Sequence, residues 1–227
     1  MSVNDDDRRP IAQREHGWAK ALTRLLAQSG ATPNFISFTS IVFAALAGAC
    51  FYAFGIATSA GDRALLCIGA ALFCQLRLLA NMMDGMVAVE GGKGGPDGPV
   101  WNELPDRFAD IFVLVGAGYG VAALGVADAA LGWAAAVAAV MTAYVREVAR
   151  GAGAPNDFSG PMAKPHRMFV MTMAALIAAS APLWAGGSAS EIVAGGIVRI
   201  ALWLVLIGAV LTTLNRARRA LEVLNKR

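Results

Sequence analysis

The chain has 227 residues, of which 57% are hydrophobic and only 15% are charged, and its mean hydropathy is +0.56. Soluble globular domains are roughly 45–50% apolar and about 25% charged, so this composition excludes an ordinary soluble enzyme. The net charge of +3 gives no reason to expect a nucleic-acid partner. Because the apolar residues form long blocks, the sequence predicts an all-α integral membrane protein.

The first 33 residues form a charged segment before the first apolar block. No continuous apolar run with a small-residue cleavage site occurs there, so we expect no cleavable signal peptide. The stretch REHGWAKALTRLLAQSG can form a helix whose apolar face opposes its cationic residues: Trp18, Leu22, Leu25 and Leu26. This pattern favours an interfacial amphipathic helix on anionic headgroups, although a soluble cap helix fits it as well.

A helix needs about 20 residues to cross a hydrocarbon core of about 30 Å. Six apolar segments meet this requirement: roughly 35–57, 64–83, 108–127, 129–148, 167–186 and 192–214. They predict one catalytic domain of six transmembrane helices over residues 34–215, followed by a basic tail at 216–227. The three cysteines lie inside these apolar runs without metal-like spacing, which indicates a packing role.

Lys and Arg residues are distributed unevenly among the connections. The N-terminal segment, the tail and two connections carry many of them, including Lys93, Arg107 and Arg146, whereas the three opposite connections carry Arg63 alone. Positive residues mark the cytoplasmic side of a membrane protein. We therefore expect a multi-pass protein of the cytoplasmic (inner) membrane with both termini and the site in the cytoplasm.

Polar side chains gather where the second span ends and the third begins. Asn81 and Asp84 share one helix face, and Asn102, Asp106 and Asp110 share another, because their spacings are three or four residues. Charged groups at membrane depth are costly and are therefore candidate functional residues. Oxygen ligands that converge here suit Mg²⁺ or Mn²⁺, which also bind phosphates. Stabilisation of a helix dipole would explain Asp106, but it does not explain Asp84.

The same stretch resembles the motif of the CDP-alcohol phosphotransferase family, D-x2-D-G-x2-A-R-x8-G-x3-D-x3-D. Every spacing is kept between residues 81 and 106. Five positions match the motif: Asp84, Gly85, Ala88, Gly98 and Asp106. Three positions depart from it, with Asn81, Val89 and Asn102 in place of Asp, Arg and Asp.

Other features extend the resemblance over nearly the whole chain. They are the TPN before the first span, the leading helix, the six spans and the basic loop YVREVARG…GPMAKPHRM. A second register takes Asp106 and Asp110 as the last two acids; it keeps more carboxylates but lengthens the spacer from eight to twelve residues. In the preferred register, Asp110 is a supporting residue one helical turn deeper.

The resemblance implies transfer of a phosphatidyl group from a CDP-linked lipid, such as CDP-diacylglycerol, to an alcohol with release of CMP. It implies one or two Mg²⁺ or Mn²⁺ ions on Asp84 and Asp106, with Asp106 also the general base. Asn81 and Asn102 would be weaker oxygen ligands, because asparagine keeps an oxygen but loses the charge, and Asp110 would assist. The departures leave open a catalytically silent relative that binds nucleotide-lipids or partner proteins.

Further residues are expected around the substrates, and the resemblance also implies a homodimer. The nucleotide would lie against Asn34, Arg77, Gly85, Ala88 and Gly98. Arg77 either replaces the charge missing at position 89 or extends to the headgroups. A phosphorylated acceptor would be bound by one basic connection: Arg146, Arg150, Lys164 and Arg167. The alternative is that these four cations bind no substrate and only set the membrane topology.

Overall fold

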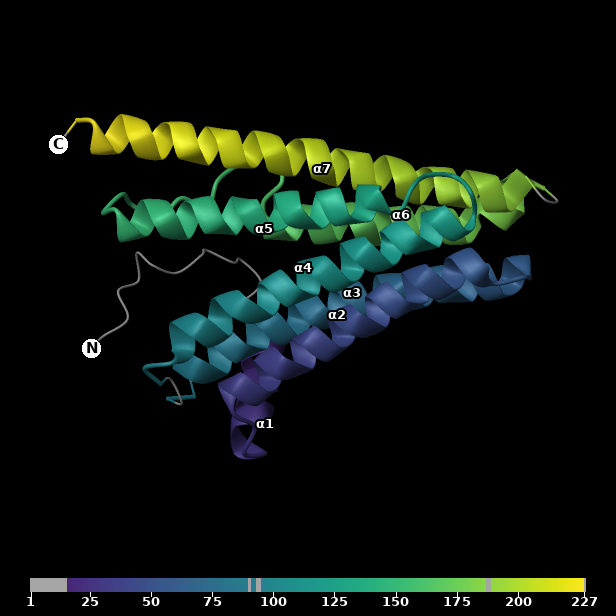
Figure 1. The fold of residues 1–227 in the computed structure, drawn as a ribbon. Helices are drawn as coiled ribbons and strands as arrows, with labels where there is room; N and C mark the ends of the chain where they lie inside the picture. Colours follow the sequence, from purple (N-terminus) through teal and green to yellow (C-terminus); the bar gives the residue numbers. More distant parts are fainter. Residues whose placement is uncertain (1–15, 90, 93–94, 187–188, 227) are drawn as a thin grey trace.

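The computed structural model describes residues 16–89, 91–92, 95–186 and 189–226 (Figure 1). Within these ranges the chain is helical and contains no strand. The helices are α1 Gly17–Gln28, α2 Pro33–Ile56, α3 Ala60–Val89, α4 Gly98–Ala123, α5 Ala130–Gly151, α6 Lys164–Trp184 and α7 Ala189–Leu224. The six predicted apolar segments each coincide with one of the helices α2 to α7, so the all-α class is confirmed.

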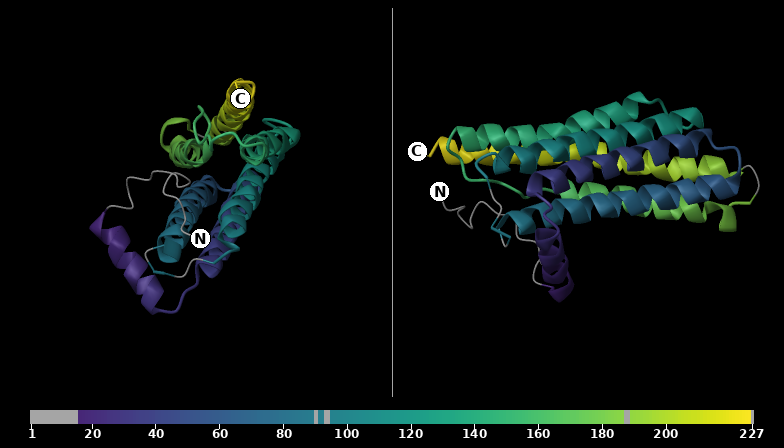
Figure 2. Two further views of the ribbon diagram at one scale, coloured as in Figure 1. Left: turned by 90° about the vertical axis from the view of Figure 1, so that its left-hand side faces the viewer. Right: turned by 90° about the horizontal axis from the view of Figure 1, so that it is seen from below.

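The long helices form two groups of three. In the first group α2 packs against α3 and α4, and in the second α7 packs against α5 and α6. Contacts of α3 with α6 and of α4 with α5 join the groups. Figure 1 shows the groups separating toward the end of the molecule where α2 begins and α7 ends. This end also holds the connections from α3 to α4 and from α5 to α6 (Figure 2).

Glycines let α2 and α4 approach until their backbones touch. A Cβ added at Gly48 would lie 2.2 Å from the carbonyl oxygen of Phe112, and one added at Gly116 would lie 2.3 Å from that of Gly48. The same occurs one step along the pair, where a Cβ at Gly55 would lie 2.2 Å from the oxygen of Gly120. Small residues are the usual means of close packing between membrane helices.

Five of the described helices are long and apolar enough to cross a membrane: α2, α3, α5, α6 and α7. The remaining predicted span, the third in chain order, is α4, which has 26 residues but carries Glu103, Asp106, Arg107 and Asp110 in its first half. Large apolar side chains such as Phe38, Leu72 and Trp203 are exposed on the outer faces of the bundle. Lipid contact accounts for such exposure, which a soluble protein rarely shows.

The two ends of the chain differ from the sequence-based expectation in detail. Helix α1 packs on the end of α3, where Ala19 and Thr23 are buried, while Trp18 and Leu25 stay exposed. The predicted apolar face is therefore divided between protein contact and outward exposure. The basic tail predicted from residue 216 is a direct continuation of α7, which runs for 36 residues, or about 54 Å at 1.5 Å per residue.

Candidate active site

Helix α3 brings three polar residues to one face near its end. Arg77, Asn81 and Asp84 are four and three residues apart, which places them on the same side of the helix. Arg77 is fully buried and Asp84 is 4% exposed, so the guanidinium of Arg77 does not extend to the headgroups. Ser37 on α2 donates a hydrogen bond of 2.7 Å to Oδ2 of Asp84.

Helix α4 supplies two buried carboxylates opposite this face. Asp106 and Asp110 are one turn apart and almost without exposure. Nη2 of Arg77 donates to Oδ1 of Asp106 over 2.9 Å, which joins α3 to α4 at this point. Asp84 is close enough to Asp106 for their charges to interact. The two helix ends therefore meet, as the motif spacing predicted.

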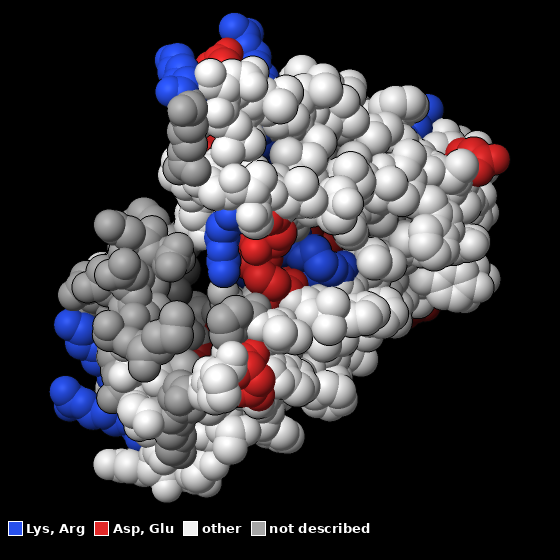
Figure 3. Space-filling view, turned by 60° about the vertical axis from the view of Figure 1, so that its left-hand side comes forward, with Lys and Arg blue, Asp and Glu red and all other residues white. Residues whose placement is uncertain are grey.

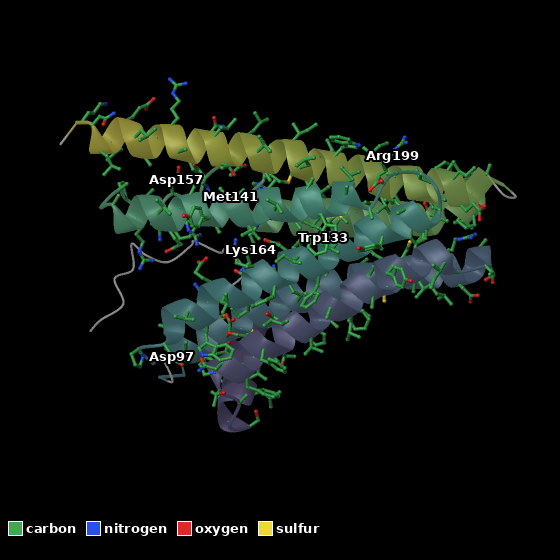
Figure 4. All side chains as sticks on the ribbon, viewed as in Figure 1. Asp97, Trp133, Met141, Asp157, Lys164 and Arg199 are labelled. Atoms are coloured by element: carbon green, nitrogen blue, oxygen red, sulfur yellow. The ribbon has the colours of Figure 1, made fainter. Side chains whose placement is uncertain are left out.

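Helix α6 contributes two cations from its first turn. The amino group of Lys164 contacts both Oδ1 of Asn81 and Oδ2 of Asp106, and it lies between the two helix groups (Figure 4). Nη2 of Arg167 donates to Oδ2 of Asp110 over 2.7 Å. We call the seven residues gathered by α3, α4 and α6 the inner cluster: Arg77, Asn81, Asp84, Asp106, Asp110, Lys164 and Arg167. Figure 3 shows acidic and basic side chains side by side in a hollow of the surface, with uncharged residues next to it and further charged side chains toward the edges of this face.

A second polar layer surrounds the inner cluster. Arg146 on α5 reaches Glu103 over 2.5 Å and Glu147 over 2.9 Å, and it lies 4.9 Å from the ring centre of Phe158. Arg150 is exposed and pairs only loosely with Glu147, at 3.6 Å. The four cations predicted to act together thus divide, with Lys164 and Arg167 in the inner cluster and Arg146 and Arg150 outside it.

Several other predicted residues lie at the margin. Asn102 lies one helical turn before Asp106 on α4 but is exposed, whereas the aspartates that follow it are buried. Asn34 donates a hydrogen bond of 2.9 Å to Oδ2 of Asp97 (labelled in Figure 4). Gly85 and Ala88 on α3 and Gly98 at the start of α4 are partly buried. Of the two predicted asparagine ligands, only Asn81 therefore belongs to the inner cluster.

Two structural partners of the site were not identified from the sequence. Ser37 reaches Asp84 from a different helix, 47 residues away in the chain. Arg216 on α7 is buried and donates to the backbone oxygens of Thr142 and Ser159, at 2.7 and 2.9 Å. Arg216 thereby fixes the connection that leads into Lys164. The sequence does not single out Arg216 as a buried residue, because it stands in a run of similar arginines.

The inner cluster does not fit the metal pair that the resemblance implies. In the part of the chain that the structure describes, no three His, Cys, Asp or Glu side chains are placed to hold one ion. Asp106 already accepts from Arg77 and Lys164, and Asp110 accepts from Arg167. A divalent ion would have to displace these cations, and Asn81 offers it no charge in return.

Comparison with known structures finds the same fold in phosphatidylinositol phosphate synthase from Mycobacterium tuberculosis. The form with CDP-DAG bound is 19% identical, with a TM-score of 0.69 over 88% of this chain and 92% of that chain. The form in complex with manganese and citrate is 18% identical, with a TM-score of 0.69 over 88% of each chain. The apo form is 18% identical, with a TM-score of 0.64 over 87% of this chain and 93% of that one.

This chain shares their fold. Models of known protein families give no match to the sequence, and curated proteins give none either. At this low identity the likeness establishes the helical architecture alone. The roles of individual residues must therefore be argued from the chemistry of the site.

Proposed function

We propose that the protein is a CDP-alcohol phosphatidyltransferase of the cytoplasmic membrane. It would move a phosphatidyl group from a CDP-linked lipid to an alcohol and release CMP. The observation that supports this most is the meeting of Asn81, Asp84 and Asp106, in the register of the family motif, with the cation of Lys164. The shared fold adds weight, since one of the matching structures holds CDP-DAG.

The reaction is an in-line displacement at the lipid-side phosphorus of the diphosphate. The acceptor oxygen forms a bond to this phosphorus while the bond to the bridging oxygen breaks, and CMP leaves with that electron pair. The proton of the acceptor hydroxyl passes to a carboxylate. Positive groups stabilise the charge that develops on the leaving phosphate.

Asp106 is the proposed base, and Arg77 holds it in place. Arg77 engages one carboxylate oxygen and Lys164 the other. When the diphosphate binds, its negative charge draws Lys164 toward it, which frees the second oxygen of Asp106 to take the proton. Asp84, oriented by Ser37, keeps a second negative charge near Lys164. No step in this mechanism passes through Mg²⁺ or Mn²⁺, because the donors present do not fit the predicted ions.

The location and assembly follow the same proposal. α4 would complete six spans, with both termini and the site facing the cytoplasm, and α1 would lie at the interface. The lipid chains of the donor would then stay in the bilayer while its diphosphate reaches the inner cluster. Arg146 and Arg150 remain available to attract an acceptor that carries a phosphate, and a homodimer remains the expected assembly.

A second candidate is a protein that binds the nucleotide-lipid without turning it over. The pairing of Asp106 with two cations favours it, because a neutralised carboxylate is a weak base. Position 81 also lacks the carboxylate of the family motif. This alternative predicts retained binding of the nucleotide-lipid and no release of CMP with any alcohol.

The test is CMP release by the purified full chain in lipid nanodiscs, with radiolabelled CDP-diacylglycerol and a panel of free and phosphorylated alcohols. We expect Asp106→Asn to lower the rate by about 100-fold or more, the usual effect of losing a general base. Asp128→Asn is the matched control, because Asp128 is exposed in the connection from α4 to α5. Equal rates for both variants would refute the role of Asp106, and no CMP release by the unmodified chain would refute the transferase.

A further inference from the structure

The charges of the inner cluster balance without any added ion. Its three carboxylates, Asp84, Asp106 and Asp110, face three cations, Arg77, Lys164 and Arg167. The resemblance to the family motif implies instead one or two divalent cations on Asp84 and Asp106. Here the cations belong to side chains of the protein itself.

Hydrogen-bond donors outnumber acceptors among the buried atoms of the inner cluster that have no partner in the described part of the chain. The donors are Nε and Nη1 of Arg77, Nδ2 of Asn81 and Nε of Arg167, whereas the one acceptor is Oδ1 of Asp110. Buried donors without a partner are costly. A site of this kind favours a ligand rich in negatively charged oxygens, and a diphosphate is such a ligand.

Compared with the aspartate of the family motif, Asn81 changes the chemistry of the site most. Its Oδ1 receives Lys164, which leaves the amide nitrogen as a donor. An aspartate at this position offers acceptor oxygens only and needs a cation between itself and a phosphate. The asparagine can donate to a phosphate oxygen directly. Lys164 has three donors, of which Asn81 and Asp106 occupy two.

We propose that Arg77, Asn81 and Lys164 bind the diphosphate of the nucleotide-lipid directly and that this site works without a divalent cation. The proposal rests on the proposed function for the identity of the ligand. Lys164 and Arg77 neutralise the charge of the diphosphate in place of metal ions. The side-chain amide of Asn81 donates a hydrogen bond to a phosphate oxygen. Asp106 holds Arg77 and Lys164 in place.

The experiment measures equilibrium binding of radiolabelled CDP-diacylglycerol to the full chain in nanodiscs, with excess EDTA, Mg²⁺ or Mn²⁺. We expect dissociation constants that agree within about twofold in the three conditions. A loss of affinity of about tenfold or more in EDTA, equivalent to about 1.4 kcal/mol, would overturn the proposal. Absence of binding in all three conditions would overturn it as well.

Two variants of the same chemical type sharpen this result. Asn81→Asp replaces a donor by a negative charge, so in EDTA it should weaken binding by about tenfold or more. Asn225→Asp, in an exposed position after α7, is the control and should change binding by less than about twofold. If Asn81→Asp instead tightens binding when Mn²⁺ is added, position 81 is a metal position and the proposal fails. If the Asn81→Asp variant does not fold, the binding of the unmodified chain in EDTA, Mg²⁺ and Mn²⁺ still tests the proposal.

The failure of this proposal can be told apart from failure of the proposed function. CMP release that requires Mg²⁺ or Mn²⁺, together with metal-dependent binding, would keep the transferase and reject the direct diphosphate site. Binding that is equal in EDTA, without CMP release to any alcohol, would keep the direct site and reject the transferase.

Discussion

The two kinds of helix contact in this protein use opposite chemistry. Within the first group, α2 and α4 meet through glycines and backbone atoms, so Gly48 and Gly116 leave no room for another atom. At the charged end, the two groups meet through ion pairs such as Lys164 with Asp106 and Arg167 with Asp110. Backbone contact is fixed once it forms, whereas an anionic ligand can compete for a cation. The difference places the adaptable contacts where we propose that the substrate binds.

The largest effect on folding is expected from breaking one of the ion pairs between the groups. Arg167→Met leaves the carboxylate of Asp110 buried without its partner, which should lower the free energy of unfolding by about 3–5 kcal/mol. The double variant with Asp110→Leu removes both charges and should recover much of this loss. Thermal and denaturant unfolding of the detergent-solubilised chain measures both effects.

The control for this pair is Arg218→Met, because Arg218 is exposed on α7 and pairs with Glu222 at the surface. Exposed pairs contribute about 0–1 kcal/mol. A single Arg167→Met variant as stable as this control would show that the ion pair does not join the two groups. A double variant less stable than both single variants would contradict the assumed cost of the buried charge.

The close contact between α2 and α4 should be weakened by the addition of a single methyl group. Gly116→Ala places a Cβ 2.3 Å from a backbone oxygen of α2, and overpacking of this kind costs about 1–3 kcal/mol. Gly196→Ala is the matched control, since no atom lies within 4 Å of its added Cβ. In a helix that second change should be neutral or stabilise by about 0.5–1 kcal/mol. Equal thermal stability of the two variants would disprove the close approach of α2 and α4.

The sequence predicted the elements well because length and hydropathy are local properties. Each apolar run became a helix, and the spacing of Asp84 and Asp106 correctly brought two helix ends together. The partners of those residues depend on contacts between distant segments. Arg77 points to Asp106 and not to the headgroups because α4 places that carboxylate, 29 residues further along the chain, beside α3. The exposure of Asn102 likewise depends on where α4 begins.

Two arginines on α7 show the same limit of prediction from the sequence. Arg216 and Arg218 are two residues apart and chemically identical, yet Arg216 is buried against the α5–α6 connection while Arg218 is exposed. A helix face separates them, and only the packing of α5 identifies which face is inside. The topology rule counts both as cytoplasmic charges and does not distinguish the exposed Arg218 from the buried Arg216.

Arg216→Gln should therefore loosen the connection that leads into Lys164. Its guanidinium donates to two backbone oxygens, and loss of hydrogen bonds from a charged donor costs about 1.5–3 kcal/mol. We expect faster hydrogen exchange over residues 152–163 and little change in α2 and α4. Arg218→Gln is the control with no expected change, and uniform acceleration over all helices would contradict a local role.

The smallest effect should come from Asp157, which lies on the same connection. Burial pushes its pKa up, but the hydrogen bonds from Ser159 and the charges of Arg219 and Arg216 hold the pKa of the carboxyl below its usual value. A lowered pKa stabilises the folded state above the pKa of the unfolded chain, about 3.9, and this contribution is lost as the pH falls through the folded pKa. Asp157→Asn should thus cost up to about 1 kcal/mol at neutral pH and nothing once the carboxyl is protonated. Thermal unfolding of both chains from pH 7 downward measures the difference, and a cost that grows as the pH falls would contradict a lowered pKa of this carboxyl.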